Sequence, residues 1–155
     1  YPQELHWENV PEYLSKVKAS AFREELKADE VLITADTVVC IHDRILGKPA
    51  DRKEAISMLQ ELSGNRHLVV TGVSVTTRTE QLSFSSRTDV FFKRLSNEEI
   101  EFYVDTYKPF DKAGAYGIQE WIGYIGIERI EGSFYNVMGL PIQKLYETLR
   151  KLQFQ

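Results

Sequence analysis

The stretch "VLITADTVVCI", residues 31–41, decides how the fold is interpreted. Apolar and β-branched residues dominate it, which predicts a β-strand with much of its surface buried. One carboxylate, Asp36, stands in its middle. A lone charged carboxylate in an apolar interior is costly unless it gains partners or a metal ion. We therefore expect Asp36 to have partners elsewhere in the chain.

The composition is that of an ordinary globular protein. The chain has 155 residues, of which 43% are hydrophobic and 27% charged, with a formal net charge of -4. This length predicts a single domain. The negative charge disfavours a nucleic-acid binder or a protein of anionic membrane surfaces, which present basic faces. No apolar run approaches the roughly 20 residues of a membrane span. The single cysteine, Cys40, excludes an internal disulfide, so we expect a cytoplasmic protein with Cys40 in its core.

Helix signals separate the β-rich runs. Residues 11–26 place apolar side chains at helical spacing. Asp51 with Glu54, and Ser96 with Glu99, have the spacing of residues that cap the start of a helix. We therefore expect three helices before the last third of the chain.

The β-rich runs predict the sheet. Residues 67–77 and 81–92 are expected to form a hairpin. Residues 111–121 are punctuated by glycine and predict an irregular segment, residues 122–130 a strand and residues 139–152 a closing helix. Because strands and helices intermix, the predicted fold class is α/β, or mixed α+β, with a mixed sheet.

Several signatures of nucleotide and metal sites are absent. The "LGKP" stretch is not a P-loop, because Pro49 stands where Ser or Thr is required and His42 where glycine is required. The sequence has no G-x-G-x-x-G, no H-E-x-x-H, no G-x-S-x-G and no cysteine cluster. The three histidines are scattered, and we interpret each as a surface or strand-end residue.

Two lysines are candidate partners of Asp36. Lys18 lies at or beside the apolar face of the first helix, and Lys48 follows the strand in a Gly-Lys-Pro loop. One carboxylate with two lysines suits a site for Mg²⁺ and a polyphosphate, in which the acid holds the metal and the lysines meet phosphate oxygens. Spacing alone favours a simpler interpretation, in which the lysines are solvated and Asp36 lies at a frayed strand end.

Longer motifs favour the metal and polyphosphate site over the simpler interpretation. Residues 34–75 and 111–145 closely resemble the Maf family of nucleoside triphosphate pyrophosphatases. The Lys-Ala pair within residues 13–22, the run at 88–92 and the run at 95–104 also match family patterns, in order and over nearly the whole chain. The resemblance implies an elongated mixed sheet flanked by helices, with a cleft between two lobes, as in inosine triphosphate pyrophosphatases. It also implies a metal-dependent hydrolase that converts nucleoside triphosphates to the monophosphate and pyrophosphate, with Mg²⁺ or Mn²⁺.

The resemblance assigns roles to single residues. Asp36 corresponds to the family's catalytic acid and metal ligand, and Lys18 and Lys48 to its phosphate-binding lysines. Thr37 and Gln119 match the branch that acts on dTTP and UTP, so base specificity is expected of them. Without the resemblance, Gln119 would be interpreted as a loop glutamine that bonds nearby backbone.

Two questions stay open at this level. Neighbouring strand residues face opposite sides, so Asp36 and Thr37 enter one cleft only if the strand ends or bulges there; otherwise Thr37 acts through its backbone or through packing. Asp111 and Lys112 either line the cleft or pair at the surface of a loop, and we favour the structural role.

The resemblance also bears on the extent of the protein. Family members begin with a strand, an S-x-S-P-R-R helix start and a glutamate ahead of the region matched here. We therefore expect residues 1–155 to be one amino-terminally incomplete domain of a longer protein, poorly active alone. Removal of modified nucleotides and a homodimer are expected by analogy, and neither a nucleic acid nor a membrane is expected as a partner. The alternative function is a nucleotide-binding regulator of cell division with little catalysis.

Overall fold

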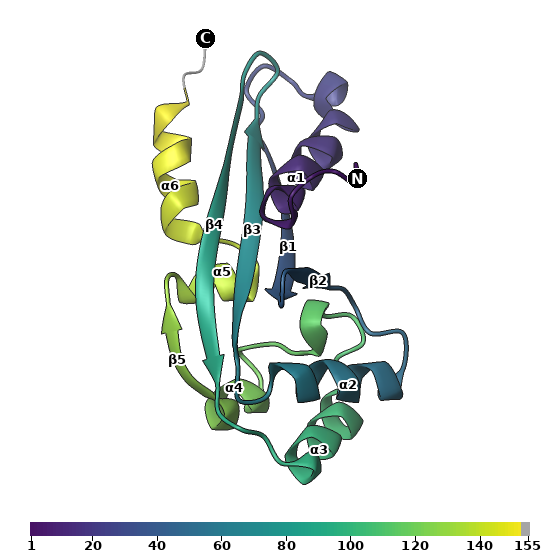
Figure 1. Cartoon of the computed structure of the whole chain (residues 1–155). Helices are drawn as coiled ribbons and strands as arrows, with labels where there is room; N and C mark the ends of the chain where they lie inside the picture. Colours follow the sequence, from purple (N-terminus) through teal and green to yellow (C-terminus); the bar gives the residue numbers. More distant parts are fainter. Residues whose placement is uncertain (153–155) are drawn as a thin grey trace.

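The computed structural model describes residues 1–152 and confirms the mixed α/β fold class (Figure 1). The strands are β1 (Leu32–Ile41), β2 (Arg44–Leu46), β3 (Arg66–Thr76), β4 (Gln81–Phe92) and β5 (Ile127–Glu131). The helices are α1 (Val10–Ser20), α2 (Arg52–Leu62), α3 (Asn97–Tyr107), α4 (Trp121–Gly126), α5 (Phe134–Met138) and α6 (Ile142–Lys151). Short 3-10 turns are η1 (Trp7–Asn9), η2 (Arg23–Glu25) and η3 (Ala113–Ala115).

The strands form one sheet in the order β2-β1-β3-β4-β5. All of its pairings are antiparallel, so the strand directions differ from the mixed sheet that we expected. The predicted hairpin is confirmed as β3 and β4, whose turn is closed by a hydrogen bond from the Thr77 amide to the Glu80 carbonyl (2.8 Å). Direct hairpin connections of this kind impose antiparallel pairing.

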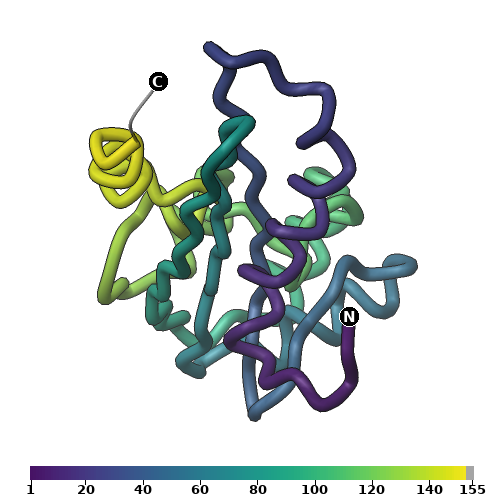
Figure 2. Tube along the Cα trace, turned by 90° about the horizontal axis from the view of Figure 1, so that it is seen from above, coloured from purple at the N-terminus to yellow at the C-terminus, as the bar shows by residue number. Residues whose placement is uncertain are grey.

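The helices cover the two faces of the sheet and one of its ends. α1 and α6 lie on opposite sides of the long β3–β4 hairpin, while α2, α3 and α4 gather at its other end (Figure 1). The view from above also separates α1 from α6 across the sheet (Figure 2). The molecule is therefore elongated along the hairpin. None of the helices within residues 1–152 is long and apolar enough to cross a membrane.

Helix capping follows the sequence patterns. The Asp51 side chain accepts a hydrogen bond from the Glu54 amide (2.8 Å) at the start of α2. Ser96 and Glu99 form the predicted capping box of α3, with hydrogen bonds of 2.8 and 3.1 Å. Local side-chain-to-backbone bonds of this kind are set by spacing alone, which is why the sequence predicted them.

Two segments differ from expectation, and the turn expected at residues 42–44 has an unusual backbone. Residues 122–130 were expected to be a strand, but α4 occupies Trp121–Gly126 and only the end of the segment pairs with β4. Periodicity does not distinguish a short apolar strand from a buried helical turn, and Ile122 is fully buried. The first helix ends at Ser20, earlier than expected. His42 and Asp43 adopt positive φ values of 52° and 59°, which form a tight turn between β1 and β2.

A glycine in the central strand sets the position of α1. Gly72 of β3 faces α1, and a methyl group on it would overlap the backbone of Pro11 and Glu12. α1 therefore rests directly on the backbone of the sheet. Two hydrogen bonds lock this contact, one between the Ser15 and Ser74 hydroxyls (2.7 Å) and one from the Thr34 hydroxyl to the Ser15 carbonyl (2.7 Å).

His67 is buried rather than exposed. It lies near the start of β3, but its side chain is only 1% exposed. Its Nε2 lies 2.6 Å from the Tyr116 hydroxyl, and its ring stacks on Phe92. Burial lowers the pKa of His67 to about 3. The imidazole is therefore neutral at neutral pH and belongs to the packed core. Cys40 is buried as predicted, and burial raises the pKa of its thiol to about 12.

Gly72→Ala should lower the free energy of unfolding by about 2 kcal/mol or more, because the added methyl group forces α1 away from the sheet. Urea denaturation measures this change. Gly47→Ala is the matched control, since a methyl group there meets no atom within 4 Å. Equal stability of the two variants would show that α1 does not depend on Gly72.

The free energy of unfolding should fall as the pH is lowered from about 6.5 to about 5. In this window the unfolded chain binds a proton at His67 and the folded chain does not, so the slope from this group reaches about 1.4 kcal/mol per pH unit. Urea titrations of His67→Gln should lack this part of the slope. His6→Gln, at an exposed histidine, should keep it, and the same slope in both variants would contradict the assignment.

Candidate active site

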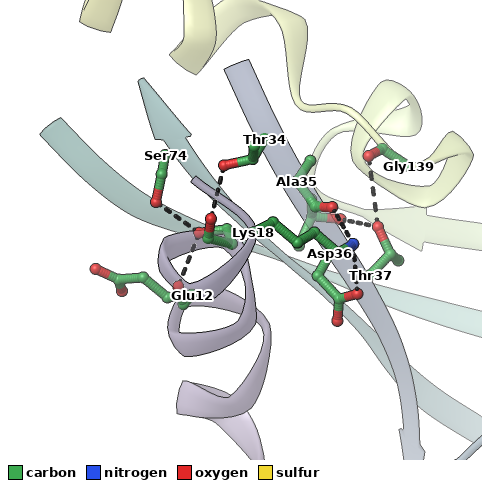
Figure 3. A network of polar contacts seen from close by, with 10 residues as sticks. Glu12, Lys18, Thr34, Ala35, Asp36, Thr37, Ser74 and Gly139 are labelled. Atoms are coloured by element: carbon green, nitrogen blue, oxygen red, sulfur yellow. Dashed lines mark hydrogen bonds and ion pairs between the residues drawn. The ribbon is translucent and has the colours of Figure 1, made fainter. Parts of the chain in front are cut away.

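Asp36 lies in an unbroken part of β1. It pairs with Gly72, and the register continues on both sides, from Leu32 opposite Thr76 to Cys40 opposite Leu68. The strand therefore neither ends nor bulges at Asp36. Since Gly72 carries no side chain on the same face, the Asp36 carboxylate lies in the space beside α1 (Figure 3).

Lys18 is the partner of Asp36. Its Nζ donates hydrogen bonds to Asp36 Oδ1 (3.0 Å) and to the Ala35 carbonyl (2.8 Å). The Lys18 side chain is 50% exposed and that of Asp36 22%, so the pair remains open to solvent and to a ligand. The position of α1 on Gly72 brings the lysine within reach (Figure 3). The predicted pairing of these two residues is thus present.

A pocket of about 280 Å³ opens on the other face of β1. Its polar lining comes from segments that are far apart in sequence, and its apolar lining comes mainly from the two central strands and α5. The polar side chains are Thr37, Lys48, Asp111, Lys112 and Gln119. The other side chains are Val39, Val69, Ala113, Tyr116, Val137 and Met138. Cations and an amide around an apolar floor suit a ligand with both an anionic part and a flat polar ring.

Backbone contacts position Lys48 in the pocket wall. The Gly47 carbonyl accepts a hydrogen bond from the Gly114 amide (3.1 Å), which joins the Gly-Lys-Pro loop to η3. Gly114 has a φ of +70°, and a methyl group on it would press on Val39. The irregular segment 111–120 is therefore bound to both β1 and the Lys48 loop.

Asp111 and Lys112 lie at the pocket. Lys112 Nζ donates to Asp111 Oδ1 (3.2 Å), and this bond, with a smaller contribution from Lys48, lowers the pKa of the Asp111 carboxyl. The earlier preference for a purely structural pair was incomplete, since both residues line the cavity. The sequence could not predict this position, because the two residues lie in an irregular loop. Only strands and helices have side-chain faces that can be predicted from spacing.

Thr37 faces the pocket through its hydroxyl. The Thr37 Oγ1 lies 2.8 Å from the Thr71 hydroxyl. It also lies 3.4 Å from the Gly139 carbonyl (Figure 3). This contact joins β1 to the end of α5. Thr37 therefore forms part of the wall of the pocket, without a break in the strand.

α5 closes the pocket, and Asn136 anchors it. The buried Asn136 amide donates to the Val69 and Ser86 carbonyls (3.1 Å each) and to the Thr88 hydroxyl (3.0 Å). Sequence analysis did not predict α5. The Asn136 bonds tie this short helix to β3 and β4. They thereby fix the positions of Val137 and Met138, which line the pocket.

The five predicted site residues fall into two groups. Lys18 and Asp36 meet on the α1 face, whereas Thr37, Lys48 and Gln119 line the pocket on the opposite face. Strand alternation separates the groups, because Asp36 and Thr37 are neighbours in β1. Within residues 1–152, no strand pairs with Leu32–Val38 on the side away from β3.

The chain offers one carboxylate where the metal is expected. Among residues 1–152, no group of three or more His, Cys, Asp or Glu side chains could hold a metal ion. Asp36 is a suitable single ligand, since Mg²⁺ often takes one or two carboxylates and completes its shell with water and substrate phosphates. The donor set therefore fits a cation that arrives with a polyphosphate and does not form a closed protein cage.

Comparisons with known proteins place the chain among relatives of one family. The family described as Maf-like protein matches residues 2–152. The dTTP/UTP pyrophosphatase of Bacteroides thetaiotaomicron is 57% identical over 152 residues, which cover 98% of this chain and 79% of the relative. That of Porphyromonas gingivalis (strain W83) is 56% identical, with 97% and 76% covered. That of Parabacteroides distasonis is 53% identical, with 97% and 78% covered.

Proposed function

Because the chain belongs to the Maf family, we propose that it hydrolyses dTTP and UTP to the corresponding monophosphate and pyrophosphate. Relatives named dTTP/UTP pyrophosphatase share more than half of its residues over nearly its whole length. The observation that supports this most directly is the pocket itself, in which Lys48, Lys112 and Gln119 surround apolar walls. No finding favours the alternative of a regulator with little catalysis.

In the proposed complex, the base and sugar occupy the pocket and the phosphates extend toward the edge of β1. Gln119 faces the pyrimidine, because its amide can both donate to a carbonyl and accept from an N–H group. Lys48 meets phosphate oxygens at the mouth of the pocket. The chain of phosphates then extends toward Lys18 and Asp36, which contact each other on the α1 face of β1.

The reaction is an in-line displacement at the α-phosphorus. A water oxygen forms a bond to the α-phosphorus while the bond between that phosphorus and the oxygen that bridges to the β-phosphate breaks. Pyrophosphate leaves with the bridging oxygen, and the proton of the attacking water passes to solvent. Asp36 accepts a hydrogen bond from the water and orients it. Because an aspartate is a weak base at neutral pH, orientation contributes more than proton abstraction. Lys18 and Lys48 offset the charge that develops on the phosphoryl oxygens and on pyrophosphate.

A divalent metal, Mg²⁺ or Mn²⁺, would be held by Asp36 together with the substrate phosphates. When bound, the metal would neutralise part of the negative charge of the phosphates. Thr37 contributes to base selection through the shape of the wall, since its hydroxyl already contacts Thr71 and Gly139. The proposal includes the removal of modified nucleotides, a homodimer and a cytoplasmic location, as expected for the family.

Asp36→Asn should lower kcat for dTTP and UTP by about a hundredfold or more, because the amide orients water poorly and binds a cation weakly. Pyrophosphate release with Mg²⁺ measures this, on this chain and on any longer natural form. Asp43→Asn, the same change in the turn after β1, is the control. Nucleotide binding without pyrophosphate release in the unaltered protein would instead favour the regulator.

Lys48→Ala should lower kcat/KM for UTP by roughly ten- to a hundredfold, as expected for a lost bond to a charged phosphate. Lys53→Ala, on the exposed side of α2, should leave kcat/KM unchanged. If both variants keep full activity, Lys48 does not bind the phosphates.

A further inference from the structure

The loop that carries Gln119 is held by a buried hydroxyl. Tyr103 of α3 is fully buried, and its hydroxyl donates a hydrogen bond to Glu120 Oε1 (2.7 Å). The Tyr103 hydroxyl oxygen in turn accepts a hydrogen bond from the Gly117 amide (3.1 Å). The two residues that Tyr103 contacts therefore lie on either side of Gln119 in the sequence.

These bonds define the shape of the turn. The Glu120 amide also donates to the Gly117 carbonyl (3.0 Å), which closes the turn around Gln119. Burial, with the nearby Glu120 carboxylate, raises the pKa of the Tyr103 hydroxyl, so it keeps its proton and its role as donor. Directional bonds in a buried setting hold a fixed geometry, since breaking one leaves a polar group unpaired.

The same carboxylate reaches the cationic side of the pocket. Glu120 Oε1 lies 3.9 Å from Lys112 Nζ. A methyl group on Gly117 would lie 2.9 Å from Glu120 Oε1 and 3.0 Å from Lys112 Cε, so both side chains pack directly over this glycine. The buried Tyr103 hydroxyl thus fixes the backbone of the turn that carries Gln119. Through Glu120 it also restrains Lys112.

The amide of Gln119 does not select a base by its chemistry alone. It can face uracil, which presents an N–H donor and a carbonyl acceptor, or turn over to face cytosine, which presents the reverse pattern. Gln119 has no side-chain hydrogen bond of its own within residues 1–152. Its placement depends on the turn, so selection for uracil requires a turn that restricts how the amide approaches the base.

We propose that Tyr103 and Glu120 are positioning residues that hold Gln119 in register with uracil and thereby set the preference for UTP over CTP. This inference rests on the proposed function, because it concerns the same pocket. It extends that function to a residue of α3 that does not line the pocket. Neither residue stands out in the sequence, since Tyr103 has the apolar spacing of a core residue and Glu120 lies in an irregular loop.

Tyr103→Phe tests the inference. It retains the ring and removes only the hydroxyl, so the Gly117 amide and Glu120 lose their common partner. The ratio of kcat/KM for UTP to that for CTP should fall about tenfold, mainly through a higher KM for UTP, with kcat nearly unchanged. Tyr107→Phe is the matched control, because Tyr107 stacks on Tyr103 in the same helix and its hydroxyl makes no hydrogen bond within the described residues.

Glu120 provides a second variant whose side chain is partly exposed, in case Tyr103→Phe fails to fold. Glu120→Gln keeps an oxygen that accepts from the Tyr103 hydroxyl and should retain most of the discrimination. Glu120→Ala should lose it as Tyr103→Phe does. In a Gln119→Ala background, Tyr103→Phe should not change the ratio further, because residues that act through one another are not additive.

Binding of UMP and CMP by calorimetry separates this inference from the proposed function. If the unaltered protein neither releases pyrophosphate nor prefers UMP, both fail. If it prefers uridine nucleotides and folded Tyr103→Phe keeps the full ratio, only the positioning role is overturned. A Tyr103→Phe effect of equal size in the Gln119→Ala background would also overturn it, since a merely structural role predicts that additivity.

Discussion

Direct contact between α1 and the backbone of β3 is the constraint on which this structure depends. It exists because Gly72 has no side chain, and Gly72 is the residue opposite Asp36 in the sheet. The close approach of α1 brings Lys18 within 3.0 Å of the Asp36 carboxylate, while the hydroxyls of Ser15 and Ser74 fix the helix along its axis. A larger residue at position 72 would widen the gap between helix and sheet and separate the ion pair. The close packing of α1 on β3 and the geometry of the charged pair therefore both depend on the absence of a side chain at position 72.

Strand alternation explains why the site has two parts. An unbroken β1 directs Asp36 toward α1 and Thr37 toward the pocket, so no local distortion brings both side chains to one point. A long, flexible polyanion can bridge such an arrangement, whereas a compact ligand cannot. The proposed assignment of the base to the pocket and of the phosphates to the edge of β1 follows from this difference in shape. The net negative charge of the chain is compatible with an anionic ligand because lysines from α1, the Lys48 loop and the Lys112 loop lie near the two parts.

Buried polar side chains hold the pocket together. Asn136 ties α5 to β3 and β4, and Tyr103 ties α3 to the loop of Gln119. Such groups are costly to bury unless they make hydrogen bonds, and the bonds donated by the Asn136 Nδ2 group and made by the Tyr103 hydroxyl favour one arrangement of the backbone. Two walls of the pocket, α5 and residues 111–119, are short or irregular segments that could not keep their shape alone. Their rigidity comes from these anchors, which lie behind the surface that a ligand would touch.

Much of the local structure could be predicted from the sequence, whereas the site could be predicted only in part. Capping by Asp51 and Ser96, the long hairpin and the buried strand around Asp36 follow from spacing and composition, since each depends on residues close together in the chain. The helix at Trp121–Gly126 and the separation of Asp36 from the pocket were not predicted in full. A short apolar run fits a strand or a buried turn equally well until its neighbours are known. The roles of Tyr103 and Gly72 depend on contacts with residues distant in sequence, and only the folded chain brings those partners together.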